Sequence, residues 1–149
     1  MLNIKEEFNA HFQKWLGMQI EDAGKEARVD DDFTPLVTQD GYDQEIYYLS
    51  GGEKTSVALA YRLALNSIVQ KVSTCMQSNL LILDEPTDGF SKEQRGKVRE
   101  ILDEVQSPQV VIVSHKKELE SFAQIRIIWA TVIPCVLGDA GVPQIHMEQ

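Results

Sequence analysis

Residues 80–86 read Leu-Leu-Ile-Leu-Asp-Glu-Pro, a short apolar run that ends in two acids and a proline. A second run of this kind, Val-Val-Ile-Val at 110–113, ends in Ser114 and His115. Apolar runs of this length between helical segments are typical of strands buried on both faces, so we expect a parallel sheet with helices on each side. Because the carboxyl ends of parallel strands meet at one edge of a sheet, the polar groups after the two runs should lie together.

Helical segments separate and follow these two runs. The segment at 52–72 is amphipathic, and its predicted buried face consists of Val57, Ala58, Tyr61, Leu65, Ile68, Val69 and Val72. The segment at 91–106 opens with the capping-box pattern Ser91-x-x-Gln94 and stops before Pro108. We expect a third helix at 116–123, followed by a β-prone stretch at 125–133.

The first fifty residues predict a helix and a hairpin. From residue 2 to about 20, apolar residues recur at helical spacing: Ile4, Phe8, Phe12, Trp15 and Leu16. This helix either packs into the core or forms the last turns of a longer coiled coil. Further on, the β-prone runs 33–38 and 45–48 flank Asp40-Gly41, which indicates a hairpin; Tyr42-Asp-Gln44 makes its predicted loop longer than two residues.

Composition narrows the class of protein. The chain has 149 residues, 43% of them hydrophobic and 25% charged, which suits one compact domain. Its net charge of −9 argues against nucleic-acid binding by this chain alone, because that affinity rests on neutralising phosphates. Cys75 and Cys135 form no zinc or disulfide pattern, and residues 127–138 are too few to span a bilayer. Without a signal-peptide pattern, we expect a cytoplasmic location, with the nucleoid or the nucleus as the site of action.

The acids after the first run suit metal and proton chemistry. Asp84 is placed to hold Mg²⁺, directly or through water, and Glu85 to orient an attacking water as a general base. Both acids could instead simply end a strand and begin a turn before Pro86. His115 is placed to hydrogen-bond a terminal phosphate, or else is an ordinary loop histidine.

Residues 49–54, Leu-Ser-Gly-Gly-Glu-Lys, precede the first long helix after the hairpin. Ser50 and Glu53 form a capping-box pattern, and the positive end of the helix favours a phosphate there. A plain cap does not explain two intervening glycines, each of which costs a helix about 1 kcal/mol relative to alanine. Glycines let backbone N–H groups approach a ligand closely, so the motif indicates a phosphate contact.

Together these motifs resemble those of ABC-type ATPases. Residues 49–54 resemble the signature motif, 80–85 the Walker B strand and Ser114-His115 the switch histidine, in family order between residues 48 and 123. Glu53-Lys54 and the amphipathic first helix look most like the SMC-like branch, and Asp84-Glu85-Pro86-Thr87 is similar to the Rad-fifty type of DNA double-strand-break repair ATPase. The resemblance implies the C-terminal lobe of a P-loop NTPase head over 25–149, an α/β fold with a mainly parallel sheet flanked by helices and a small hairpin. Residues 1–24 would end a coiled-coil helix.

The resemblance assigns roles residue by residue. The nucleotide-binding residues it implies are Leu49, Ser50, Gly51, Gly52, Glu53 and Lys54. Lys54 and Arg62 match the two basic switch residues of the signature helix, although the first is typically Arg. Asp88, Gly89 and Ser91 occupy the D-loop, where this chain has Ser91 in place of the usual Asp.

The chain contains no P-loop, because Gly24-Lys25 and Gly96-Lys97 are followed by Glu26 and Val98 rather than Ser or Thr. In the families it resembles, the P-loop lies in an N-terminal half that a long coiled coil joins back. The resemblance therefore implies ATPase activity with ATP and Mg²⁺ only when that half is joined and two heads enclose the nucleotide. The implied partners are that half, a second head, a Mre-eleven-type nuclease near the coiled-coil base, and DNA through the assembled complex.

Two other functions fit parts of the pattern. One is a different ATPase of the same class, either another SMC-like head or the nucleotide-binding domain of a transporter. The other is a non-catalytic interaction module in which the motifs are relics. The intact Asp84, Glu85 and His115 argue against the module.

Overall fold

The computed structural model describes residues 4–20, 22, 24–72, 80–105, 107, 109–116, 119, 126–127 and 147–148. The chain divides into two compact units, residues 1–115 and 116–149. In the second unit, strands β6 (Arg126–Ile127) and β7 (Met147–Glu148) pair antiparallel. Most of the helix expected at 116–123 and most of the β-prone stretch at 125–133 lie outside the described residues. The motifs up to His115 belong to the first unit.

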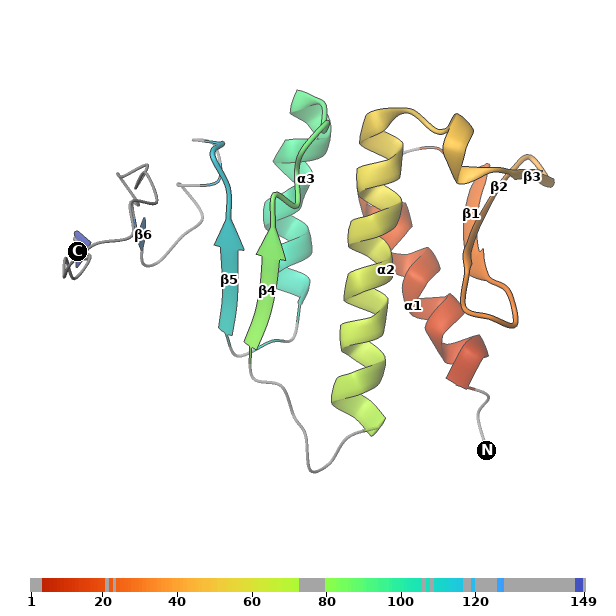
Figure 1. The fold of residues 1–149 in the computed structure, drawn as a ribbon, viewed down its shortest axis with the longest axis horizontal. Coiled ribbons are helices and arrows are strands. Elements are labelled where there is room, and N and C mark those ends of the chain that lie inside the picture. The colour runs from red at the N-terminus through yellow and green to blue at the C-terminus, as the bar shows by residue number, and fades with distance from the viewer. Residues whose placement is uncertain are drawn as a thin grey trace, which may run out of the picture. The chain divides into compact units, whose positions relative to one another are not determined.

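Helix α1 (Ile4–Gln19) packs against α2 and strand β1 in the first unit (Figure 1). Its predicted face is confirmed at Phe8, Phe12, Trp15 and Leu16, which are buried, whereas Ile4 near the helix start is exposed. The rings of Phe8 and Phe12 lie 5.0 and 5.7 Å from the ring of Tyr61 on α2. Edge-to-face aromatic pairs of this kind add about 0.5–1.5 kcal/mol each beyond the burial of their area. Over its described length, α1 is a core-packing helix.

The hairpin at Asp40-Gly41 is confirmed, but its second strand lies earlier than predicted. Strand β2 (Pro35–Gln39) pairs with β3 (Tyr42–Gln44) across a two-residue loop in which Asp40 and Gly41 both have positive φ. That loop type twists as the strands do, so it closes directly and Tyr42 pairs with Gln39. The predicted strand at 45–48 is wrong: η1 (Ile46–Tyr48) is a 3₁₀ turn. Tyr47 and Tyr48 in this turn are exposed. β-Propensity mainly measures how well a side chain packs against neighbouring strands, so it favours a strand only weakly where the side chains are exposed.

The same sheet contains a strand that the sequence pattern did not indicate. β1 (Lys25–Val29) pairs antiparallel with β2 and gives the order β1-β2-β3. Ala27 and Val29 point inward and are buried, whereas Glu26 and Arg28 are exposed. With only one large apolar residue, Val29, the alternation in this segment was too weak to predict a strand.

Helix α2 (Gly51–Val72) forms where predicted, but it buries a different face. Val57 and Ile68 are buried as expected, whereas Leu65, Val69 and Val72 are 48%, 40% and 60% exposed. The buried set is Ser56, Val57, Leu59, Ala60, Leu63, Ala64 and Ile68. Two alanines and a serine add little to an apolar pattern, so the larger exposed side chains determined the predicted face.

Strands β4 (Leu80–Asp84) and β5 (Gln109–Val113) confirm the parallel pairing, with Asp84 opposite Val113. Helix α3 (Lys92–Glu104) lies beside them in Figure 1, and its predicted capping box between Ser91 and Gln94 is present. Within the part of the chain that the structure describes, the two faces of this strand pair differ in how far they are covered. Leu83 is buried, but the alternate face leaves Leu80, Ile82, Val111 and Val113 between 38% and 60% exposed.

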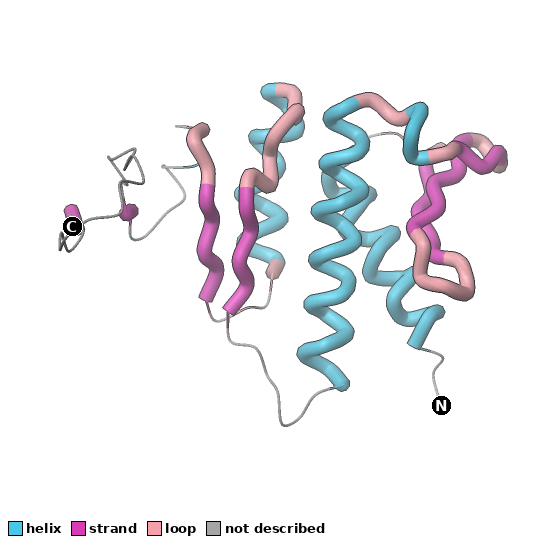
Figure 2. Tube along the Cα trace, viewed as in Figure 1, coloured by secondary structure: helices cyan, strands magenta, loops and turns pink. Residues whose placement is uncertain are grey.

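Figure 2 shows the chain leaving β4 and β5 into loops at the same end of the pair. Asp84 is the last residue of β4 at this end, and the loops contain Glu85 and His115. None of the described helices combines the length and the apolar character that crossing a membrane requires.

Candidate functional site

The start of α2 is an open helix mouth. Ser50 and Gly51 are exposed, while Leu49 just before them is buried and anchors the loop. The predicted capping box is present: the Ser50 amide and hydroxyl both donate to Glu53 Oε2, at 2.8 and 2.7 Å. The Glu53 amide in turn donates to Ser50 Oγ at 3.3 Å. Ser50 and Gly51 are thus the exposed residues of this mouth, where the positive end of the helix dipole suits an anion.

The two glycines of the mouth have different surroundings. A Cβ at Gly52 would lie 2.9 Å from the Gly89 carbonyl oxygen and 3.1 Å from Gln94 Oε1, whereas at Gly51 it would meet nothing within 4 Å. Gly89 itself has φ +76° and faces the backbone of Gly51 and Gly52. A contact within the chain therefore requires glycine at position 52, whereas at Gly51 the chain itself leaves room for a side chain. The predicted contact of both glycines with a nucleotide stays a prediction.

Ser91, the residue that replaces the usual D-loop Asp, caps α3. Its hydroxyl accepts from the Gln94 amide at 3.2 Å, and Gln94 Oε1 accepts from the Ser91 amide at 3.0 Å. Gln94 Nε2 also donates to Ser56 Oγ on α2 at 3.2 Å, and Ser56 is fully buried. The D-loop and the signature helix are therefore joined by side-chain hydrogen bonds as well as by the Gly52–Gly89 contact.

At the ends of β4 and β5, the structure brings Glu85 and His115 together. Glu85 Oε1 accepts from the His115 amide at 3.0 Å and lies 2.7 Å from Nδ1 of the His115 ring. Glu85 Oε2 accepts from Ser114 Oγ at 3.0 Å. Glu85 has φ 42°, in the left-handed region, which costs a non-glycine residue roughly 1–2 kcal/mol. Its amide donates to the Val113 carbonyl at 2.9 Å, so contacts with β5 hold both its backbone and its carboxylate. Strained residues held in this way cluster at functional sites.

These contacts also set the charge of Glu85. The hydrogen bond from His115 lowers the pKa of the Glu85 carboxyl most, and hydrogen bonds from Ser114 and from the His115 amide lower it further against a raising effect of burial. The carboxylate is therefore ionised at neutral pH, as a proton acceptor must be. Ser114 is the member of this cluster to which the sequence assigned no separate role.

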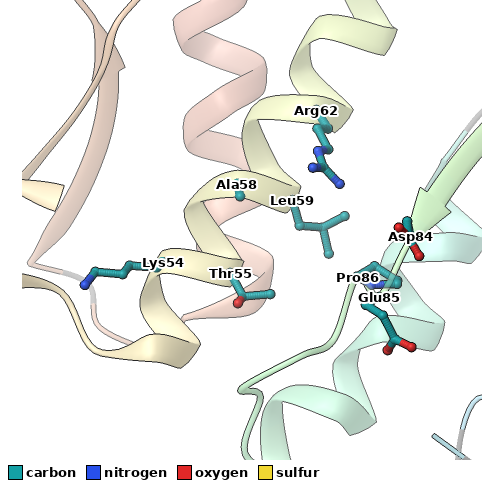
Figure 3. Close-up of a pocket in the computed structure, with 8 residues that line it drawn as sticks. All are labelled: Lys54, Thr55, Ala58, Leu59, Arg62, Asp84, Glu85 and Pro86. Atoms are coloured by element: carbon teal, nitrogen blue, oxygen red, sulfur yellow. The ribbon is translucent and has the colours of Figure 1, made fainter. Parts of the chain in front are cut away.

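A hollow of about 310 Å³ joins the strand ends to α2 (Figure 3). Its lining consists of Lys54, Thr55, Ala58, Leu59, Arg62, Asp84, Glu85 and Pro86. In Figure 3, Arg62 extends toward the side of Asp84, whereas Lys54 points away from the acids. The Lys54 Nζ lies 5.3 Å above the ring of Tyr47 instead. The two predicted switch residues thus differ in what they face, and Arg62 is the one directed toward the acids.

The chemistry of the hollow fits Mg²⁺ held largely by a nucleotide. Asp84 is exposed at its rim, and a carboxylate oxygen is a ligand that Mg²⁺ prefers. Within the described ranges, no group of three or more His, Cys, Asp or Glu side chains could hold a metal by itself. Mg²⁺ in phosphate-transferring sites is bound by one or two carboxylates together with phosphates and water, so a single Asp84 suffices.

Solved structures of SMC ATPase heads have the fold of this chain. One, from work on ATP-driven dimerization and DNA stimulated activation of SMC ATPases, matches 97% of this chain and 84% of its own length with a TM-score of 0.65 and 18% identity. An SMC head bound to the C-winged helix domain of ScpA matches 83% of this chain and 39% of its own, with a TM-score of 0.63 and 20% identity. The predicted fold class is confirmed: the chain has the α/β fold of an SMC-type ATPase head.

The sequence is similar to one kind of ATPase in particular. The DNA double-strand break repair Rad50 ATPase of Thermoplasma acidophilum is 39% identical over 104 residues, which is 66% of this chain and 11% of that protein. Its counterpart in Archaeoglobus fulgidus is 41% identical over 90 residues, which is 59% of this chain and 10% of that protein. No family model matches the chain. The predicted resemblance to Rad50-type ATPases is confirmed, and the chain spans about a tenth of the length of these relatives.

Proposed function

We propose that this chain is the C-terminal half of an SMC-like ATPase head that acts in DNA double-strand-break repair. One observation carries the proposal: Asp84 and Glu85 share an open hollow with the first turns of α2, whose mouth at Ser50 and Gly51 is exposed. A phosphate-directed helix mouth and a pair of acids at a strand end are complementary parts of an ATP-hydrolysing site. The similarity to Rad50 ATPases supports the choice of biological process.

In this proposal, the site residues have different roles in ATP hydrolysis. Asp84 would hold Mg²⁺, which when bound neutralises charge on the phosphate oxygens. Glu85 would take a proton from the attacking water, because its ionised carboxylate is fixed by Ser114 and His115. His115 would hold Glu85 in place and contact the terminal phosphate. Ser50 and Gly51 would bind the nucleotide held by a second head, because both residues are exposed at the start of α2.

Two exposed apolar surfaces support the proposal that an N-terminal half of the head packs against this chain. Leu65, Val69 and Val72 follow one another at helical spacing on α2, and all three are exposed. The open face of the β4–β5 pair consists of Leu80, Ile82, Val111 and Val113. Fully burying each aliphatic side chain contributes roughly 1.5–3 kcal/mol, so two such surfaces favour a partner that extends the sheet. The P-loop that the sequence lacks would come from this half.

The remaining assignments follow from the same arrangement. Arg62 would respond to changes at Asp84, whereas Lys54 would act on the outer side of the mouth beside Tyr47. Asp88, Gly89 and Ser91 would transmit the state of one site to the other, because Gly89 and Gln94 contact the signature helix. DNA and a Mre-eleven-type nuclease would bind the assembled complex, the nuclease near α1 at the coiled-coil base. A net charge of −9 is consistent with DNA contact through the complex rather than through this chain alone.

The direct test combines the chain with its P-loop half. We expect negligible ATPase activity from the chain alone and measurable activity from the pair, with ATP-dependent association of two heads in light scattering. Glu85→Gln should lower the turnover number of the pair by about 10²–10⁴-fold, the usual contribution of a general base, while ATP still drives association. Glu100→Gln is the matched control on the exposed side of α3 and should leave turnover unchanged. Glu85-dependent hydrolysis by the chain alone would contradict the proposal.

A further inference from the structure

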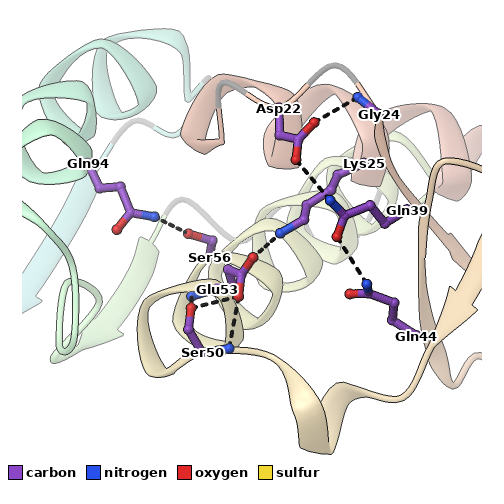
Figure 4. Close-up of polar contacts among 9 residues, drawn as sticks. All are labelled: Asp22, Gly24, Lys25, Gln39, Gln44, Ser50, Glu53, Ser56 and Gln94. Carbon is purple, nitrogen blue, oxygen red and sulfur yellow. Dashed lines mark hydrogen bonds and ion pairs between the residues drawn. The ribbon is translucent and has the colours of Figure 1, made fainter.

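Lys25, at the start of β1, reaches the carboxylate of Glu53 on α2 (Figure 4). The two form an ion pair between Lys25 Nζ and Glu53 Oε1, and the Lys25 side chain is only 10% exposed. A lysine this deeply covered is uncommon unless its charge is paired. The pair is therefore partly buried, with the Glu53 side chain 26% exposed.

Glu53 connects this pair to the helix mouth. Its Oε1 faces Lys25, and its Oε2 accepts both the amide and the hydroxyl of Ser50. An unpaired carboxylate would oppose an anion at the mouth and would lose the contact that holds its rotamer toward Ser50. Pairing with Lys25 offsets that charge and fixes the rotamer of Glu53, so that Ser50 is oriented by a carboxylate whose charge is balanced by the neighbouring ammonium.

Lys25 is itself held from α1. Gln13 Nε2 donates to the Lys25 carbonyl at 3.3 Å, and the Ala27 amide donates to Gln13 Oε1 at 2.6 Å. The Lys25 amide also donates to the Asp22 carbonyl at 3.1 Å. One glutamine of α1 therefore fixes the backbone on both sides of Glu26, and polar contacts continue from α1 through Lys25 and Glu53 to Ser50.

We infer that Lys25 is a positioning residue for the phosphate-binding mouth: through Glu53 it orients Ser50 and offsets the negative charge beside it. The inference rests on the proposed function for its ligand, the terminal phosphate of ATP. The link from Lys25 to Ser50 depends only on the contacts within this chain. Lys25 would touch neither the nucleotide nor the reacting atoms.

The first experiment measures amide hydrogen exchange at Ser50 and Glu53 by NMR in the full 149-residue chain. Lys25→Met should speed both exchange rates by about tenfold, the effect of weakening a charge-assisted hydrogen bond, while exchange at the buried Ala60 is unchanged. Lys25→Arg keeps the charge and should restore slow exchange. Arg28→Met is the matched control, because it removes an ion pair to Asp43 from the same strand without affecting Glu53.

The second experiment measures the ATP concentration that half-saturates head association, with the P-loop half present. We expect Lys25→Met to raise it about tenfold and Lys25→Arg to keep it close to that of the unchanged chain. If Lys25→Met unfolds the chain, as a changed Ala60 signal would show, Lys25→Gln replaces it in both measurements, because it also removes the charge but keeps a polar side chain and leaves Glu53 unchanged.

The outcomes distinguish a failure of the Lys25 inference from a failure of the proposed function. Equal exchange at Ser50 in Lys25→Met, Arg28→Met and the unchanged chain overturns the inference. Faster exchange with an unchanged ATP requirement also overturns it, because Ser50 would then not depend on Lys25 for phosphate binding. Faster exchange in a chain whose association never responds to ATP supports the positioning of Ser50 and contradicts the proposed function.

Discussion

The α1–α2 region and the β4–β5 region of the first unit differ in how completely their apolar side chains are covered. In the helical region, Phe8, Phe12 and Tyr61 form a ring cluster, and both phenylalanines are almost fully buried. In the strand pair, Ile82 and Val113 are 60% and 53% exposed on one face. Exposed apolar surfaces of this kind are typical of interaction sites. The ring cluster of α1 and α2 is thus covered within this chain, whereas one face of the strand pair, like the α2 face of Leu65, Val69 and Val72, is open, as the proposed N-terminal half would require.

The largest expected effect tests this difference directly. Phe12→Ala should lower the free energy of unfolding by about 3–5 kcal/mol, because it removes a fully buried ring from the aromatic cluster. Ile82→Ala should change it by no more than about 0.5 kcal/mol, since that side chain is largely in water. Urea unfolding followed by circular dichroism measures both values. Similar losses for the two variants would break the comparison.

A smaller effect concerns the contact through which the two regions meet. Gly52→Ala should lower the free energy of unfolding by about 1–3 kcal/mol, because its Cβ would press against the Gly89 carbonyl oxygen at 2.9 Å. Gly51→Ala places its Cβ in open space and should leave stability unchanged or raise it by up to about 1 kcal/mol. Thermal unfolding of the two variants provides the measurement. A harmless Gly52→Ala would show that the D-loop can move away from the mouth.

The smallest expected effect is a pH dependence in the β4–β5 region. The pKa of Glu85 is lowered in the folded chain, so its ionised form adds stability above the pKa of the unfolded state, and this stability is lost as pH falls through the folded value. Carbon-detected NMR titration should show Glu85 protonating at lower pH than an ordinary glutamate. His115→Ala should move the pKa of Glu85 upward, because it removes the largest cause of the shift. An unchanged titration in His115→Ala would show that the pair seen at 2.7 Å does not persist in solution.

Local patterns predicted the elements that depend on local chemistry. The capping box of Ser91 and Gln94 and the turn at Asp40-Gly41 follow from residues near one another in sequence. The parallel pairing of β4 and β5 was predicted from the apolar character of each run and from the helical segments around them. Patterns failed where burial depended on a neighbour distant in sequence. Ile46–Tyr48 is β-prone but pairs with none of the described strands, whereas Lys25–Val29, which no pattern indicated as a strand, pairs with β2.

For the site, the sequence by itself determined which groups are present: the acids at 84 and 85, the histidine at 115, and a capped, glycine-bearing helix mouth. Only the tertiary structure decided what each group contacts. It joined Glu85 to His115 and Ser114, assigned Gly52 to a contact with Gly89, and brought Lys25 to Glu53. The reason is that motif chemistry is encoded within a few residues of one segment. Orientation and charge balance instead come from side chains 28 or more positions away, which only the folded chain brings within hydrogen-bonding distance.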